Sequence, residues 1–265
     1  MRTYKILLSA GVLAISCVIA YMSFMYVYTD HMFAPITLLE KPHSVFTYTE
    51  WTSPVVPFIH KVNTPSRAHQ KDKKYPGFEI DVLSYNGELL AAHDPLEANR
   101  NIKLVDIFNA ISNPQEKIFW LDVKGELSDE EINKIVQQAA LYGIPTEHLL
   151  FEASAGPTAK RITQKNLGLL LPLLEGFDED NNNPTTRAQL NARMLALWEE
   201  YKPIAVSASF GKYAYLRAYF PHMPKAIYYS ATRRPSIKKL FMRQHMAQDP
   251  SVKIFMTDEY SWINL

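Results

Sequence analysis

Short apolar runs alternate with polar or amphipathic segments from about residue 56 to the end of the chain, and this rhythm constrains the fold more than any other feature of the sequence. Such runs are typical of parallel strands buried on both faces, with crossover helices in the segments between them. Eight runs occur, at residues 56–60, 78–83, 118–123, 149–153, 167–173, 205–210, 226–230 and 252–257. Eight strands in this rhythm predict an α/β fold, a closed TIM (β/α)8 barrel, in a single domain.

The segments between the runs contain the helices that this fold requires. We expect helices at 104–111, 129–141, 187–201 and 237–246, the second of which begins after Ser128, a typical N-cap residue. A doubly wound open sheet is the alternative arrangement of the same units. That fold usually carries a glycine-rich turn after its first strand, and no such turn follows the first run, so the closed barrel is favoured.

The N-terminal segment 6–29 contains no charged residue and is long enough to span a bilayer as a helix. Arg2 and Lys5 precede the segment and Asp30 follows it, so the positive-inside rule places the rest of the chain on the extracytoplasmic side, periplasmic or extracellular. We expect a single N-terminal transmembrane helix that anchors the protein in the membrane, with a cleaved signal peptide as the alternative. The predicted domains are an anchor or signal segment at 1–29, a linker at 30–54 and the barrel at 55–265.

Composition excludes several classes of function. Lys and Arg total 28 against 27 acidic residues, and the net charge of +1 gives no electrostatic reason to expect nucleic acid as a partner. Cys17 is the only cysteine, which excludes an intramolecular disulfide and a cysteine-based zinc cluster. Any catalysis must therefore come from carboxylates, imidazoles, hydroxyls or lysines.

Acidic residues gather where the second and third predicted strands end. The alternation of a strand places Glu79 and Asp81 on one face of 78–83, and Asp122 lies near the end of 118–123. Because strand ends meet at one rim of a TIM barrel, we expect these three carboxylates to lie together. Clustered carboxylates repel one another unless a cation lies among them, and oxygen ligands suit a hard divalent ion. The sequence therefore predicts a site for Mg²⁺, with Ca²⁺ as the alternative.

Two histidines and a lysine are expected at the same rim. His60 ends the first run, His93 follows the second by about ten residues, and Lys124 follows the third. Lys124 and the ion would hold the non-bridging oxygens of a phosphodiester and balance the charge that develops at phosphorus. One imidazole would accept a proton from the attacking hydroxyl while the other protonates the leaving oxygen. This set predicts cleavage of a phosphodiester, either by water or by a substrate hydroxyl that forms a cyclic phosphate.

These motifs resemble the PLC-like phosphodiesterase superfamily. Residues 79–82 (Glu-Ile-Asp-Val) followed by 93–95 (His-Asp-Pro) are similar to the Glu-x-Asp and His-Asp pattern of glycerophosphodiester phosphodiesterases. Residues 60–63 (His-Lys-Val-Asn) are closer to the His-x-Val-Asn of the sphingomyelinase D group and of the menorin-like proteins. Residues 121–124 (Leu-Asp-Val-Lys) resemble the Asp-x-Lys of sphingomyelinase D, and 257–262 resemble its acidic, Trp-containing tail.

The resemblance implies a TIM barrel in which the three carboxylates bind Mg²⁺ and His60 and His93 are the acid-base pair. We further expect Asn63, Lys124 and Trp262 to contact the substrate, with packing in the core as the alternative for Trp262. We therefore expect a metal-dependent phosphodiesterase, a hydrolase or lyase, that acts on a glycerophosphodiester or a phospholipid headgroup beside the membrane. The alternative is a non-catalytic, membrane-anchored binding module on the same barrel. A third option is that the anchored chain is one component of an envelope complex.

Some polar residues carry weaker expectations. Glu152 ends the fourth run, where it either reaches the rim or pairs with a loop. Ser207 and Ser209 end the sixth run without the nucleophile elbow of a serine hydrolase, which excludes that reading. Residues 71–74 (Lys-Asp-Lys-Lys) are expected to form a solvated helix face.

Overall fold

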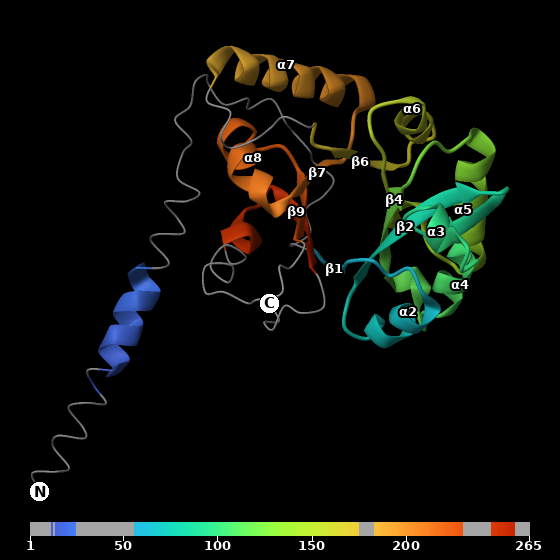
Figure 1. Ribbon diagram of the computed structural model, residues 1–265, viewed down its shortest axis with the longest axis horizontal. Coiled ribbons are helices and arrows are strands. Elements are labelled where there is room, and N and C mark those ends of the chain that lie inside the picture. The colour runs from blue at the N-terminus through green and yellow to red at the C-terminus, as the bar shows by residue number, and fades with distance from the viewer. Residues whose placement is uncertain (1–11, 13, 25–55, 175–182, 230–244, 258–265) are drawn as a thin grey trace, which may run out of the picture.

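The computed structural model describes residues 12, 14–24, 56–174, 183–229 and 245–257, and these contain a closed parallel barrel (Figure 1). Neighbouring strands around the barrel are parallel, and β1 pairs with both β2 and β9, which closes the ring. The barrel strands are β1 (Val56–Ile59), β2 (Gly77–Tyr85), β4 (Ile118–Val123), β5 (Leu149–Glu152), β6 (Gly168–Pro172), β7 (Ala205–Ser209), β8 (Lys225–Tyr229) and β9 (Val252–Thr257). All eight predicted strands are present, and the closed barrel is confirmed over the open sheet.

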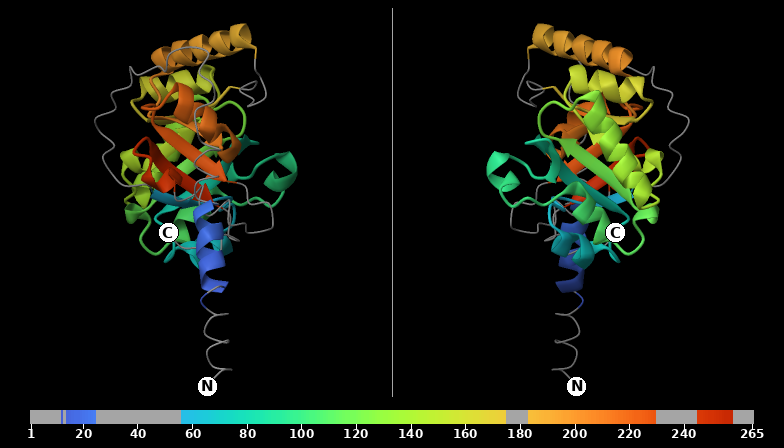
Figure 2. Two further views of the ribbon diagram at one scale, coloured as in Figure 1. Left: turned by 90° about the vertical axis from the view of Figure 1, so that its left-hand side faces the viewer. Right: turned by 90° about the vertical axis from the view of Figure 1, so that its right-hand side faces the viewer.

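Helices follow most strands and cover the outside of the barrel (Figure 2). They are α2 (Pro65–Lys71), α3 (Pro95–Ala98), α4 (Leu104–Asn109), α5 (Asp129–Leu141), α6 (Pro157–Gln164), α7 (Pro184–Tyr201) and α8 (Tyr213–Tyr219). Short 3-10 turns lie at Pro114–Glu116, Thr146–His148 and Phe210–Lys212.

The predicted start is confirmed for one capped helix and wrong for another. The helix α5 begins after Ser128, whose hydroxyl accepts the Glu131 N–H, and it ends at Leu141 as expected. The helix α7 begins three residues before the predicted start, because the Asn183 side chain caps it ahead of a proline. Most of the predicted helix 237–246 lies outside the described residues.

One strand that was not predicted, β3 (Glu88–Ala91), forms an antiparallel hairpin with the part of β2 that extends beyond the barrel. The turn consists of Asn86 and Gly87, both with positive φ (51° and 78°). An Asn-Gly pair between two apolar segments is the usual signal for such a hairpin, so the sequence did contain the information. The returning strand leads directly to His93, which makes the hairpin part of the candidate site.

Apolar side chains fill the interior of the barrel. The inward-facing cluster contains Phe58, Trp120, Leu150, Leu170, Ala205, Ala226, Ile254 and Met256. The small residue Gly77 lies opposite Phe58, and a Cβ atom on Gly77 would come within 2.3 Å of the Phe58 ring. A large residue on β1 therefore packs against a small one on β2 at this point of the interior.

The predicted anchor falls largely outside the described residues. Val12 and residues 14–24 are helical, and the remainder of 6–29 and the linker 30–54 are not described. In the part of the chain that the structure describes, no helix has both the length and the apolar character needed to cross a membrane.

The expectation for residues 71–74 is wrong in part. Lys71 and Asp72 are 8% and 4% exposed, because α2 ends at Lys71 and the chain then turns inward. The Asp72 carboxylate accepts the Ser112 N–H at 2.9 Å and pairs with the Lys117 ammonium at 3.3 Å. Asp72 therefore joins the end of α2 to the loop before β4, whereas Lys73 and Lys74 are exposed as expected.

Candidate active site

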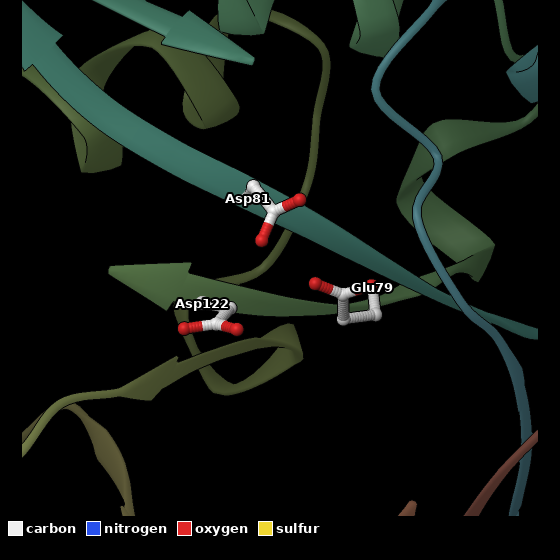
Figure 3. Close-up of side chains that lie close together, drawn as sticks. All are labelled: Glu79, Asp81 and Asp122. Carbon is white, nitrogen blue, oxygen red and sulfur yellow. The ribbon is translucent and has the colours of Figure 1, made fainter. Parts of the chain in front are cut away.

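Glu79, Asp81 and Asp122 lie together at the end of the barrel where the strands finish (Figure 3). Asp81 and Asp122 are paired in the register of β2 and β4, and Glu79 is two residues before Asp81 on the same inward face. Each residue offers a carboxylate oxygen, and these three oxygens lie within 4.8 Å of one another. Glu79 and Asp81 are each 1% exposed. The structure therefore brings together the three carboxylates that the sequence predicts.

Asn63 holds Asp81 in place. Its Nδ2 group donates to Oδ2 of Asp81 at 2.6 Å, and the Asp81 backbone N–H donates to Oδ1 of Asn63 at 3.0 Å. Both ends of the buried amide are therefore used by one aspartate, which identifies Asn63 as a positioning residue. Its predicted contact with the substrate stays a prediction.

Glu79 is held by only one of its carboxylate oxygens. The Lys61 backbone N–H, in a residue with a positive φ of 56°, donates to Oε2 at 2.5 Å. The other oxygen, Oε1, is buried and has no hydrogen-bond partner. Burial and the neighbouring Asp81 raise the pKa of Glu79 well above its usual value. An unpartnered carboxylate oxygen beside two further carboxylates fits a hard divalent cation, whose preferred ligands are such oxygens.

Lys124 places an ammonium group between two of the carboxylates. Its Nζ atom is 2.5 Å from Oδ2 of Asp122 and 3.0 Å from Oδ1 of Asp81. Burial lowers the pKa of Lys124, but the hydrogen bond and the charge of Asp122, together with Asp81, outweigh it and raise the pKa above its usual value. The side chain is therefore a permanent positive charge that reduces the repulsion among the acids.

His60 lies beside this cluster at the end of β1. Its Nε2 atom is 3.6 Å from Oε2 of Glu79, and 30% of its side chain is exposed. The backbone around it is fixed, because the His60 N–H donates to the Thr257 carbonyl and the Arg67 guanidinium donates to the His60 carbonyl. The imidazole thus borders the carboxylates and is accessible from solvent.

His93 lies just beyond β3, on the hairpin that the sequence analysis missed. The Ala92 N–H donates to the Asp81 carbonyl at 3.1 Å, which fixes this loop beside β2. The His93 side chain is 48% exposed, and its Nδ1 atom is 3.8 Å from Oδ2 of Asp94. Within the described part of the chain, the ring makes no hydrogen bond or ion pair with the three clustered carboxylates. The structure therefore places His93 at the same end of the barrel but turned toward solvent.

Glu152 is a fourth carboxylate at this end of the barrel. Of the two positions expected from the sequence, at the rim or paired with a loop, it occupies the one at the rim. It is the register partner of Asp122 on β5. Its carboxylate accepts hydrogen bonds from Nε1 of Trp120 at 2.6 Å and from Oγ of Ser207 at 2.5 Å. Burial and the charge of Asp122 raise its pKa to about 7. The remaining predicted substrate-binding residue, Trp262, lies outside the described residues.

Comparisons with known proteins show the fold but no family. No protein-family model matches the chain, and no curated protein matches it. A glycerophosphodiester phosphodiesterase from Parabacteroides distasonis superposes with a TM-score of 0.51 at 9% sequence identity, covering 82% of this chain and 94% of that one. At this identity the likeness shows a shared barrel, and it does not show a shared activity.

Two other solved barrels are less similar. A dipeptide epimerase from Cytophaga hutchinsonii gives a TM-score of 0.45 at 9% identity and covers 91% of this chain and 60% of that one. An orotidine 5'-monophosphate decarboxylase from Methanocaldococcus jannaschii gives 0.42 at 11% identity and covers 77% and 89%. These weaker likenesses carry no argument about function.

Proposed function

We propose that this protein is a metal-dependent phosphodiesterase. The observation that carries the proposal is the cluster of three carboxylate oxygens within 4.8 Å, one of them on a buried glutamate whose second oxygen has no partner. Lys124 and His60 border this cluster, so binding groups and a proton-transfer group lie beside one another. The class of substrate, a glycerophosphodiester or a phospholipid headgroup, is supported by the motifs that carry the resemblance and by the barrel shared with a glycerophosphodiester phosphodiesterase.

Glu79, Asp81 and Asp122 would hold one Mg²⁺ or Ca²⁺ ion, which supplies positive charge next to a phosphate oxygen. Asn63 would orient the Asp81 carboxylate toward the ion, because its Nδ2 donates to Oδ2 of Asp81 and its Oδ1 accepts from the Asp81 backbone N–H. Lys124 presents its ammonium group to the phosphate from the β4 side and stabilises the negative charge that grows on the non-bridging oxygens.

His60 and His93 would move the protons. His60 borders Glu79 and is the better placed of the two to act at the phosphorus centre in the arrangement that the structure shows. His93, on the hairpin loop, would act on the oxygen at the other side of the phosphorus, on the solvent side of the site. The same pair serves attack by water and attack by a substrate hydroxyl, since each reaction needs one base and one acid.

The test is turnover of a glycerophosphodiester by the purified protein with Mg²⁺, with EDTA, and after His60→Ala. Relative to the wild type with Mg²⁺, we expect EDTA and His60→Ala each to lower kcat/KM at least about 100-fold. For His60→Ala the reason is that general acid-base catalysis typically contributes a factor of about 10² to 10⁴. For EDTA the reason is loss of the positive charge that the ion supplies beside the phosphate. His222→Ala is the matched control, since His222 lies between α8 and β8 and has no place in the site. Turnover that survives both EDTA and His60→Ala would contradict the proposal.

The second candidate is a binding module without catalytic activity. The observation that favours it is Lys124, whose ammonium already bridges Asp81 and Asp122 and so neutralises part of the charge that a metal would neutralise. This candidate predicts that phosphate esters bind while no phosphodiester is cleaved, in the same preparations and at the same Mg²⁺ concentrations.

A further inference from the structure

The inward-facing residues at the ends of the strands divide this end of the barrel into two halves. The strands β2, β4 and β5 supply acidic residues. Leu170, Ala205 and Ala226 on β6, β7 and β8 face inward. Side chains two residues apart on a strand share a face, so Pro172, Ser207 and Tyr228 face inward as well. Together with Ser209 and Met256, these positions form a half that is uncharged among the described residues and consists of Pro172, Ser207, Ser209, Tyr228 and Met256. A phosphate bound to an ion at the three clustered carboxylates would direct its alcohol portions across this end of the barrel, toward the residues of the other half.

Glu152 lies at the boundary between the two halves. It is paired with Asp122 on the acidic side and with Leu170 on the uncharged side. Trp120 and Ser207 each donate one hydrogen bond to it, to different carboxylate oxygens. Because each carboxylate oxygen accepts two hydrogen bonds, one acceptor position on each oxygen remains for another donor. The two protein donors also fix the orientation of the carboxylate, so those positions are preorganised.

Tyr228 provides a second polar group, on β8, where it is the register partner of Ser209. It is 36% exposed, so a ligand can reach it. Burial, with smaller contributions from the charges of Glu152 and Asp122, raises the pKa of its hydroxyl above the usual value. The hydroxyl is therefore a neutral donor and acceptor on the uncharged side.

Charge balance indicates what Glu152 is suited to bind. Among the described inward-facing residues at this end of the barrel, four carboxylates stand against one ammonium from Lys124 and the two charges of one divalent ion. If all four carboxylates are ionised, their negative charge exceeds the positive charge of Lys124 and the ion, even before an anionic phosphate binds. Glu152 is not among the three clustered carboxylates, so its free acceptor positions suit a hydrogen-bond donor carried by the ligand.

We propose that Glu152, oriented by Trp120 and Ser207 and flanked by Tyr228, is a specificity-determining residue that accepts a hydrogen bond from the alcohol portion of the substrate. This inference rests on the proposed function in one respect, the position of the phosphate at the three clustered carboxylates. The preferred ligands are phosphate esters whose alcohol carries a hydroxyl or an ammonium group within two carbons of the ester oxygen. An ester with a purely aliphatic alcohol leaves these acceptor positions without a partner.

The test is calorimetric binding of three phosphate monoesters of equal size to the full chain at pH 8 with Mg²⁺. The ligands are propyl phosphate, 2-hydroxyethyl phosphate and 2-aminoethyl phosphate. We expect at least one of the two donor-bearing esters to bind at least tenfold more tightly than propyl phosphate. Glu152→Gln, which keeps the shape of the side chain and loses its charge, is expected to reduce that ratio at least fivefold. Tyr228→Phe is a second variant that leaves the carboxylate in place and is expected to reduce the ratio by a smaller factor.

The two donor-bearing ligands distinguish the sources of the hydrogen bond. A larger effect of Glu152→Gln on 2-aminoethyl phosphate identifies an ammonium group as the preferred donor, and a larger effect on 2-hydroxyethyl phosphate identifies a hydroxyl group. Glu199→Gln is the matched control, since this glutamate is 72% exposed on α7 and pairs only with Lys202. Equal affinities for all three esters in the wild type, or a ratio that Glu152→Gln leaves unchanged, overturn the inference while phosphodiester turnover still stands. If none of the three esters binds, both this inference and the proposed function are overturned.

Discussion

At the scale of single residues, the site contains more buried negative charge than Lys124 can neutralise, and this has a consequence for stability. Glu152 has its pKa raised from 4.5 to about 7 by burial and by the charge of Asp122. A carboxyl group with a raised pKa in the folded state stabilises the fold at low pH. That contribution is complete below pH 4.5 and is lost as the pH rises through 7.

Glu152→Gln removes this pH dependence, because glutamine does not ionise and can still accept from Trp120. We expect the free energy of unfolding of the variant, minus that of the wild type, to increase by up to about 3 kcal/mol as the pH rises from 4.5 to 7.5. Urea denaturation in EDTA at a series of pH values measures the difference. Glu199→Gln, at an exposed position, should give a difference that does not change with pH. If the difference for Glu152→Gln also does not change with pH, ionisation of the buried Glu152 does not destabilise the fold and the prediction is wrong.

Individual contacts in the site were not predictable from the sequence. The alternation of a strand identifies Glu79, Asp81 and Asp122, because side-chain direction follows from position along a strand. The bonds between Asn63 and Asp81 depend on how the loop after β1 folds back onto β2, which no local pattern encodes. Glu152 was left undecided for the same reason, since its partner Ser207 is 55 residues away.

At the scale of secondary structure elements, the strands were predicted well because each is a continuous apolar run, and β4 and β9 match their predicted bounds. The hairpin strand β3 was missed because it is short, and its pairing with β2 lies outside the regular rhythm of strand and helix. That omission matters for function, since His93 follows β3. The exposed position of His93 could not be predicted from its place in the sequence.

The hairpin depends on the conformation of its turn. Gly87 has a φ of 78°, which an L-residue adopts at a cost of about 1–2 kcal/mol. Gly87→Ala is therefore expected to lower the free energy of unfolding by about 1 kcal/mol, although a Cβ atom meets no other atom there. Gly211→Ala is the matched control, because Gly211 also has open space around it and lacks a positive φ. Chemical denaturation of both variants measures the difference, and equal stabilities would contradict a strained turn.

At the scale of the whole molecule, the closed barrel explains why residues far apart in the sequence form one site. Parallel strands all finish at one end, so β1, β2, β4 and β5 deliver His60, the three clustered carboxylates and Glu152 to the same place. The barrel itself was predictable from the number and spacing of the strands. The substrate was not, because barrels of this kind support many reactions and the sequence specifies only the residues at the rim.

The N-terminal segment 6–29 bears on where the molecule resides. The uncharged segment 6–29, preceded by Arg2 and Lys5, predicts that the full chain is held in a membrane with the barrel on the extracytoplasmic side. We expect the full chain to stay in the membrane pellet after an alkaline carbonate wash, and a chain of residues 30–265 to appear in the supernatant. A mass measurement separates the alternative of a cleaved signal peptide, which predicts loss of the segment. A full-length chain of intact mass in the supernatant would show that this segment does not anchor the protein, and the substrate would then be sought among soluble phosphodiesters and not at a lipid surface.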